Sequence, residues 1–178
     1  VPLYKTFLVK NNYKLPYPLM NIINGGAHAN NDLRIQEFMI RPDKAKSFSE
    51  AMRICFVVIN NLRDLIKKKG LSTSVGDEGG FAPMIDSNEK ALDLVVASIN
   101  KSGFKNGKDV SICLDVAANE LIKKDKYSIH SSQYISTDQS IKKYQKIIDK
   151  YKIRSIEDPF GENDWISWSK MMKSVKNV

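Results

Sequence analysis

Residues 110–115 read VSICLD and residues 153–158 read IRSIED, so two short apolar segments each end in carboxylates. Apolar runs of this length predict buried β-strands, and the apolar residues over 137–151, between the two runs, recur at helical spacing. A strand, a helix and a second strand in succession predict parallel strands whose carboxyl ends meet at one edge. Active sites of α/β barrels lie at that edge. These residues therefore predict an α/β fold that forms one side of a barrel.

The other elements expected from the sequence extend this pattern and leave the barrel incomplete. An initial strand pair is expected at 19–24 and 35–40, separated by the loop GGAHANND, and a weaker extended piece at 127–130. A closed barrel takes about 250 residues, so 178 residues are expected to form an open, partial barrel. Two further helices are expected, one from Phe48 to a stop at Gly70 and one from Asp86 or Ser87 to Gly103. A last helix is expected to turn a stripe of residues toward the core: Trp165, Trp168, Met171 and Met172.

The composition predicts a single partial domain over 1–178, because 42% of the residues are hydrophobic. No apolar run approaches the roughly 20 residues of a membrane-spanning helix. The net charge of +8 comes largely from lysines on outer helix faces and helix ends, so nucleic-acid binding is not indicated beyond that charge. Cys55 and Cys113 each lie in an apolar run and are expected to be buried free thiols, which fits a reducing cytoplasm.

Three acidic residues, Glu78, Asp115 and Glu157, are expected at successive strand ends. Converging carboxylates suit Mg²⁺, because the ion prefers oxygen ligands and removes the repulsion between them. Asp115 and Glu157 are the stronger candidates for metal ligands, whereas the glycines around Glu78 also fit a tight loop. Each carboxylate could instead cap the next helix or form an ordinary surface pair.

Two further segments place polar residues in or beside apolar strands. His28 follows two glycines in a loop that allows close backbone approach to an anionic group, although an ordinary turn has the same composition. Gln36 and Glu37 lie within the apolar segment IQEFMI, which indicates either a polar pocket or an edge facing solvent. His130 has no acidic or cysteine partner nearby in the sequence, so it is assigned no role.

Five strings, read in order, carry a family resemblance: LMNIINGGAHANN, IQEFMIRP, SVGDEGGFAP, LDVAANE and SIEDPFGENDW all resemble enolase. The resemblance covers essentially the whole chain and implies a partial TIM barrel of the enolase type. It also implies a carbon–oxygen lyase, phosphopyruvate hydratase, which uses Mg²⁺ to dehydrate 2-phosphoglycerate reversibly to phosphoenolpyruvate in glycolysis. The family resemblance further implies a cytoplasmic homodimer, with additional display at cell surfaces.

The resemblance implies a role for each acidic candidate. Asp115 and Glu157 resemble two of the three carboxylates that hold Mg²⁺, and Glu157 also resembles a substrate contact. Glu78 resembles the general acid that assists the departure of hydroxide. Glu37 resembles the neighbouring helper of that acid and a further substrate contact.

Other matched positions are implied to contact the substrate. His28 resembles the loop histidine that closes over it, and Gln36 stands at a position that contacts it in bacterial members. Two positions depart from the family pattern: Met84 stands where asparagine is usual, and Asn119 where serine is common. Both departures leave the carboxylates intact.

The resemblance also implies that the enolase site is divided by the ends of this sequence. The third metal carboxylate, the base lysine, a second substrate lysine and the phosphate-binding arginine and serine are expected beyond Val178. The N-terminal domain, with its loop serine for a second Mg²⁺, is expected before Val1. The chain alone is therefore expected to be inactive, because it holds the acid side of the site and two metal ligands without the base.

Two alternatives remain open. Another member of the superfamily, or another metal-dependent α/β-barrel lyase, would share the strand-end carboxylates. Racemases would present a lysine motif on an early strand, whereas the acid in GDEGG fits dehydration of a phosphorylated acid. A non-catalytic binding role, with RNA-processing or host proteins, is permitted by the charge of +8. A steep loss of affinity with added salt would mark such binding as electrostatic.

Overall fold

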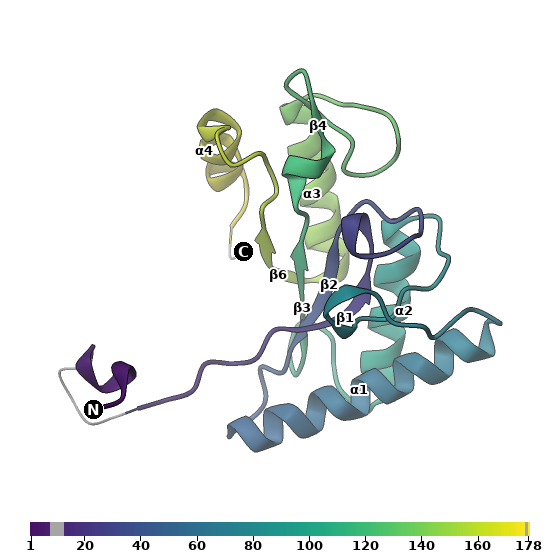
Figure 1. Cartoon of the computed structure of the whole chain (residues 1–178), viewed down its shortest axis with the longest axis vertical. Coiled ribbons are helices and arrows are strands. Elements are labelled where there is room, and N and C mark those ends of the chain that lie inside the picture. Colours follow the sequence, from purple (N-terminus) through teal and green to yellow (C-terminus); the bar gives the residue numbers. More distant parts are fainter. Residues whose placement is uncertain (8–12, 177) are drawn as a thin grey trace.

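A computed structural model of the chain describes residues 1–7, 13–176 and 178. Its body is a four-stranded sheet covered by helices, and residues 13–19 lead away from that body (Figure 1). The α-helices are α1 (Phe48–Lys68), α2 (Asn88–Lys101), α3 (Thr137–Tyr151) and α4 (Trp165–Ser174). The strands are β1 (Met20–Asn24), β2 (Glu37–Arg41), β3 (Ser111–Asp115), β4 (Ile122–Lys123), β5 (Lys126–Tyr127) and β6 (Ile153–Glu157). Short 3₁₀ helices are η1 (Leu3–Thr6), η2 (Gly26–His28), η3 (Asp77–Gly79) and η4 (Ala118–Leu121).

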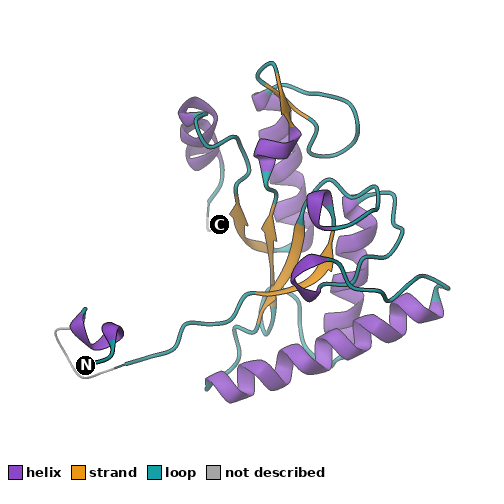
Figure 2. Ribbon diagram, in the orientation of Figure 1, coloured by secondary structure: helices purple, strands orange, loops and turns teal. Residues whose placement is uncertain are grey.

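The main sheet has the strand order β1-β2-β3-β6 and does not close on itself (Figure 2). β2 is antiparallel to both β1 and β3, whereas β3 and β6 are parallel and are joined through α3. The predicted open, partial α/β barrel with an initial strand pair is therefore confirmed. The weaker extended piece predicted at 127–130 is wrong beyond its first residue, since only Tyr127 belongs to a strand, in the separate β4–β5 hairpin.

The two faces of the sheet differ in chemistry because alternate residues of a strand point to opposite sides. One face joins the hydrophobic core beneath the helices through Phe38, Ile40, Ile112 and Leu114. The other face, which corresponds to the inside of the barrel, carries Glu37, Met39, Cys113 and Asp115. The apolar face therefore anchors the sheet, and the mixed face presents its polar groups to the barrel interior.

The helix starts follow from their capping residues. The Ser47 side chain accepts a hydrogen bond from the Glu50 N–H at the start of α1, and Ser87 does the same for Lys90 in α2. Helix α3 begins with a capping box, in which Ser136 and Gln139 satisfy each other's backbone N–H groups. The predicted helices over these regions are confirmed, and their capping orients the helices that cover the apolar face.

The predicted core-facing stripe on the last helix is only half right. Met171 is buried and Trp168 is half-buried, with its indole N–H donating to the carbonyl of Gly161. Trp165 and Met172 are exposed by 77% and 68%. These two residues are seven positions apart and so share a helix face, which is the exposed one. Proximity in sequence to the buried pair made them look like core residues.

The cysteine prediction is confirmed, because Cys55 and Cys113 are both buried and free. Burial raises the pKa of the Cys55 thiol to about 11, so this thiol stays neutral at ordinary pH. Among the helices that the structure describes, none has the length and apolar character needed to cross a membrane.

Candidate functional site

Four polar residues form a row across one end of the sheet. The register pairs Asn24 with Glu37, Glu37 with Asp115, and Asp115 with Glu157. Directly paired residues project from the same face. Because β2 runs against its neighbours, Glu37 begins its strand, whereas the other three residues end theirs. One carboxamide and three carboxylates therefore share one end of the barrel interior.

Glu37 lies at the centre of this row and is only 8% exposed. Burial is the largest cause that raises the pKa of Glu37 to about 8, followed by a side-chain hydrogen bond with Glu78. The negative charges of Glu78, Asp115 and Glu157 raise it further. The protonated form of Glu37 therefore predominates at neutral pH, and its O–H is the donor in the hydrogen bond with Glu78.

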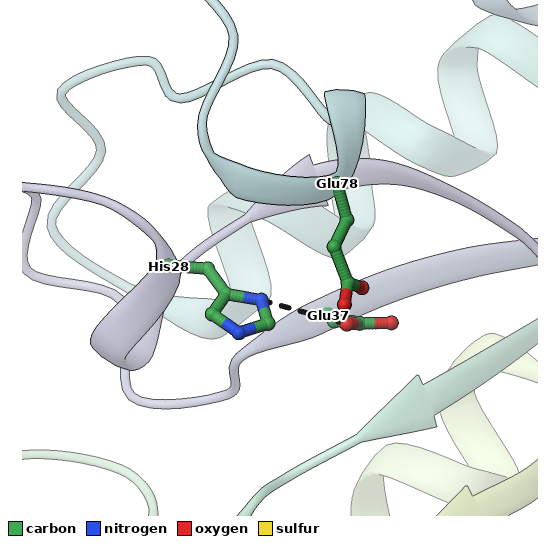
Figure 3. Close-up of side chains that lie close together, drawn as sticks. All are labelled: His28, Glu37 and Glu78. Atoms are coloured by element: carbon green, nitrogen blue, oxygen red, sulfur yellow. Dashed lines mark ion pairs between the residues drawn. The ribbon is translucent and has the colours of Figure 1, made fainter.

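His28 completes a compact cluster with these two glutamates (Figure 3). One ligand-type atom from each of His28, Glu37 and Glu78 lies within 4.8 Å of the others. The Nδ1 atom of His28 is 3.5 Å from Oε1 of Glu37. This nitrogen is buried and forms no hydrogen bond to the residues that the structure describes. The His28 side chain as a whole is still 22% exposed, so its ring is partly accessible from outside the cluster.

Glu78 reaches the cluster from a turn rather than from a strand end. It lies in η3 with a φ of 63°, in the left-handed region that non-glycine residues seldom adopt. The turn is closed by a hydrogen bond of 2.8 Å from the Gly76 N–H to the Gly80 carbonyl. Phe81, just beyond it, exchanges backbone hydrogen bonds with β1. The expectation of a strand end is therefore wrong for Glu78, and the tight-loop alternative is correct.

Asp115 and Glu157 are neighbours on the parallel pair β3–β6. Burial raises the pKa of both carboxyls, and the negative charge of Asp115 further raises that of Glu157. Oδ1 of Asp115 also accepts a hydrogen bond of 3.0 Å from the Ala117 N–H, which fixes the direction of its carboxylate. Two partly buried carboxylates of the same negative charge thus lie side by side and repel each other.

Comparison with known proteins matches residues 12–178 to the family model described as enolase, C-terminal TIM barrel domain. The chain belongs to the enolase family. It is 86% identical over all 178 residues to an enolase from Pelagibacter ubique, of which it covers 43%. It is 46% identical over 167 residues to an enolase from Corynebacterium kroppenstedtii, and this match covers 93% of the chain and 39% of that protein. An enolase from Natranaerobius thermophilus is 45% identical over 177 residues, covering 99% of the chain and 42% of that protein.

The chain thus spans less than half the length of these enolases. Within its part of the enolase barrel, the donor chemistry distinguishes two groups of side chains. Asp115 and Glu157 offer only carboxylate oxygens, which suit a hard cation such as Mg²⁺. Burial, and after it the negative charge of neighbouring carboxylates, raises the pKa of both groups, and a cation would offset this cost. The cluster with His28 mixes nitrogen and oxygen donors and already shares a proton between its glutamates. The residues therefore fit a metal at the first pair and proton handling at the second group.

Of the other sequence positions considered, Gln36 lies beside this candidate site and His130 does not. The Gln36 N–H donates to the Asp115 carbonyl at 3.1 Å, and its own carbonyl accepts from the Gly25 N–H at 2.9 Å. Its backbone therefore links β3 to the loop that carries His28. His130, to which the sequence assigned no role, lies elsewhere, with Nδ1 3.3 Å from Oε1 of Glu89.

Asn24 was not identified from the sequence, although it lies in the same row as the carboxylates. It is completely buried at the end of β1 and its amide nitrogen bonds the turn that carries Glu78. A signal was present in the sequence, because a polar residue ends the apolar strand MNIIN immediately before two glycines. Buried polar side chains are retained where a hydrogen bond requires them.

Proposed function

We propose that the full-length protein containing this chain catalyses the reversible, Mg²⁺-dependent dehydration of 2-phosphoglycerate to phosphoenolpyruvate, and that the chain alone is inactive. The observation that supports this function best is the cluster of His28, Glu37 and Glu78 beside the paired carboxylates Asp115 and Glu157. This arrangement combines a proton-sharing pair with oxygen ligands for a cation, the two requirements for removing hydroxide from a carboxylate substrate.

In the proposed reaction, Asp115 and Glu157 would hold Mg²⁺ together with a ligand from outside this chain. When bound, the ion supplies positive charge that stabilises the doubly charged carboxylate formed as the neighbouring carbon loses its proton. Glu157 also lies against the substrate. The proton leaves to a base that this chain does not contain, so the residues present here cannot begin the reaction by themselves.

The second half of the reaction uses the residues of the cluster. Glu78 donates a proton to the departing hydroxyl, so the carbon–oxygen bond breaks and water leaves as the carbon–carbon double bond forms. Glu37 is the protonated partner of Glu78 and supplies the hydrogen bond through which Glu78 recovers a proton. His28 and Gln36 contact the anionic substrate, and the His28 side chain is 22% exposed beside the cluster.

We also propose the wider properties that the resemblance implies. The chain is a single partial domain over 1–178, and the full-length protein is a glycolytic homodimer of the cytoplasm, with additional display at cell surfaces. The matched enolases support the glycolytic assignment through their names.

The test uses a chimaeric enolase in which this chain replaces the matching segment of the Pelagibacter ubique protein. Formation of phosphoenolpyruvate from 2-phosphoglycerate is followed with Mg²⁺ and after its removal by a chelator, for the chimaera and for this chain alone. We expect turnover only by the chimaera with Mg²⁺. The control Glu120→Gln removes an exposed carboxylate in η4, outside the row, and should leave turnover unchanged. An inactive chimaera that is folded and dimeric would contradict the proposed function.

A further inference from the structure

The side chain of Asn24 is enclosed between the two loops of the candidate site. It is 0% exposed, and its Nδ2 atom donates to the Asp77 carbonyl at 2.6 Å. Its Oδ1 atom accepts from the Asn21 side chain at 3.1 Å. The carboxamide thus has a donor and an acceptor in use where water is excluded, and an unmade bond there would be costly.

The bond to Asp77 controls the backbone of Glu78. The Asp77 carbonyl and the Glu78 N–H belong to one rigid peptide plane, so holding that carbonyl orients the plane and restricts the rotation about the N–Cα bond of Glu78. Glu78 has a φ of 63°, which costs a non-glycine residue about 1–2 kcal/mol. Such a conformation persists only when surrounding contacts hold it. The Asn24 amide supplies one of these contacts.

The turn also fits closely around Asn24. A Cβ atom added at Gly80 would lie 2.0 Å from Oδ1 of Asn24, and one added at Gly76 would lie 3.1 Å from its Cβ. The glycines at both ends of the turn therefore allow it to close over the carboxamide. On the other side, Asn31 donates to the carbonyls of Asn24 and Pro83, which ties the His28 loop to the same segment.

We propose that Asn24 is a positioning residue for Glu78, and this proposal rests on the proposed function, in which Glu78 is the acid. Without the amide bond, the Asp77–Glu78 peptide turns toward ordinary backbone angles and carries the Glu78 carboxylate away from Glu37 and the departing hydroxyl. Asn24 itself transfers no proton. Its loss should therefore slow the acid step and spare the removal of the substrate proton by the base outside this chain.

The experiment separates these two steps in the chimaeric enolase. Exchange of the C2 hydrogen of 2-phosphoglycerate with deuterium in D₂O reports proton removal, and phosphoenolpyruvate formation reports the complete dehydration. In Asn24→Ala, we expect dehydration to fall by roughly 10² fold, the loss typical of a misplacement of about 1 Å. The exchange rate should change by less than about twofold, so the ratio of exchange to dehydration should rise.

Two further variants make the result specific. Gly80→Ala keeps the Asn24 residue, but the added methyl group displaces the Asn24 side-chain oxygen. This variant should therefore also raise the ratio of exchange to dehydration. Asn31→Ala is the matched control, because it removes carboxamide bonds to Asn24 and Pro83 but none to Asp77. Asn31→Ala should leave the ratio unchanged. Equal losses of exchange and dehydration in Asn24→Ala would assign Asn24 a purely structural role and overturn the proposal.

Hydrogen–deuterium exchange of the backbone in the same proteins gives a readout that does not depend on activity. Asn24→Ala and Gly80→Ala should lose amide protection in the peptide that contains residues 76–80, whereas Asn31→Ala should keep it. Unchanged protection in Asn24→Ala would overturn the proposal even if activity fell. A chimaera without any turnover would instead contradict the proposed function, and the amide measurement would still decide whether Asn24 holds the turn.

Discussion

The two ends of the sheet differ in how their acidic groups are paired: one end groups them together, and the other pairs an aspartate with an arginine. At one end, the pKa values of Glu37, Asp115 and Glu157 are all raised, first by burial and then by the negative charges of nearby carboxylates. At the other end, Nε of Arg41 lies 2.5 Å from Oδ1 of Asp43, and the Ser111 hydroxyl donates to the same carboxylate. The second end uses its charges to stabilise the fold. The first keeps like charges together, which costs stability and is typical of sites that bind a cation or move protons.

The largest expected effect comes from breaking the proton-sharing pair at the acidic end. Glu78→Gln keeps the shape of the side chain but cannot donate the proton to the departing hydroxyl. We expect kcat for phosphoenolpyruvate formation in the chimaeric enolase to fall by about 10²–10⁴ fold, the usual contribution of a general acid. Steady-state kinetics measure this loss, with Glu120→Gln as the control. A Glu78→Gln variant that retains most of its kcat would remove Glu78 from the role of acid.

Neutralising one aspartate at each end should give effects of opposite sign. Asp43→Asn removes the charge that pairs with Arg41 and should lower the free energy of unfolding by about 1–2 kcal/mol. Asp115→Asn removes a like charge from the acidic row while its side-chain oxygen can still accept the Ala117 N–H, so it should raise that free energy without Mg²⁺. Urea unfolding of both variants tests the comparison. Destabilisation by both substitutions would show that repulsion among the acidic residues does not lower the stability of the fold.

The pH dependence of stability should report the proton on Glu37. The pKa of Glu37 is about 8 in the folded chain against 4.5 normally, so the folded state binds the extra proton between these values. The free energy of unfolding should therefore fall as pH rises across this window, by at most about 1.4 kcal/mol per pH unit. Glu37→Gln should flatten this slope, leaving a smaller one from Asp115 and Glu157. An unchanged slope in urea titrations at pH 5, 6, 7 and 8 would place the proton elsewhere.

The smallest effect is expected at the end of the sheet that carries Arg41 and Asp43, where Lys44 pairs with Asp109. The pKa of Asp109 is lowered mainly by a hydrogen bond from the Lys105 N–H, and only in part by Lys44. The Lys44 side chain is 61% exposed, and its Nζ atom is 3.7 Å from Oδ1 of Asp109. Exposed pairs contribute little because water and salt screen them. Lys44→Ala should leave the midpoint of urea unfolding within experimental error, and a clear decrease would show that the ion pair, not the backbone, holds this loop.

Much of the fold could be predicted from local patterns. Cys113 and Leu114 in an apolar run ending at Asp115 identify β3, and Ser136 with Gln139 identifies the start of α3. These signals concern residues close in sequence. Which face of α4 is buried could not be predicted in the same way. Met171 is buried and Met172 is exposed because of how α4 packs against other elements of the fold, and neighbouring residues in the sequence do not show that packing.

The site was predictable in its members and not in its geometry. Asp115 and Glu157 could be placed together because both end parallel strands. Glu37 joins them only because β2 is antiparallel and therefore begins where its neighbours end, which depends on strand order. The left-handed backbone of Glu78 lies beside the Asp77 carbonyl, which accepts a hydrogen bond from Asn24 across 53 positions of sequence. Such pairings leave no periodic signal for a single sequence to show.

The position of β6 at the edge of the sheet has a consequence for the chain in solution. In the part of the chain that the structure describes, β6 has β3 on one side and no strand of the main sheet on the other, and Ile156 is only half-buried. Exposed strand edges template the addition of further strands from other molecules. Concentrated solutions of this chain are therefore expected to self-associate through β6 and to gain β-structure as they do so.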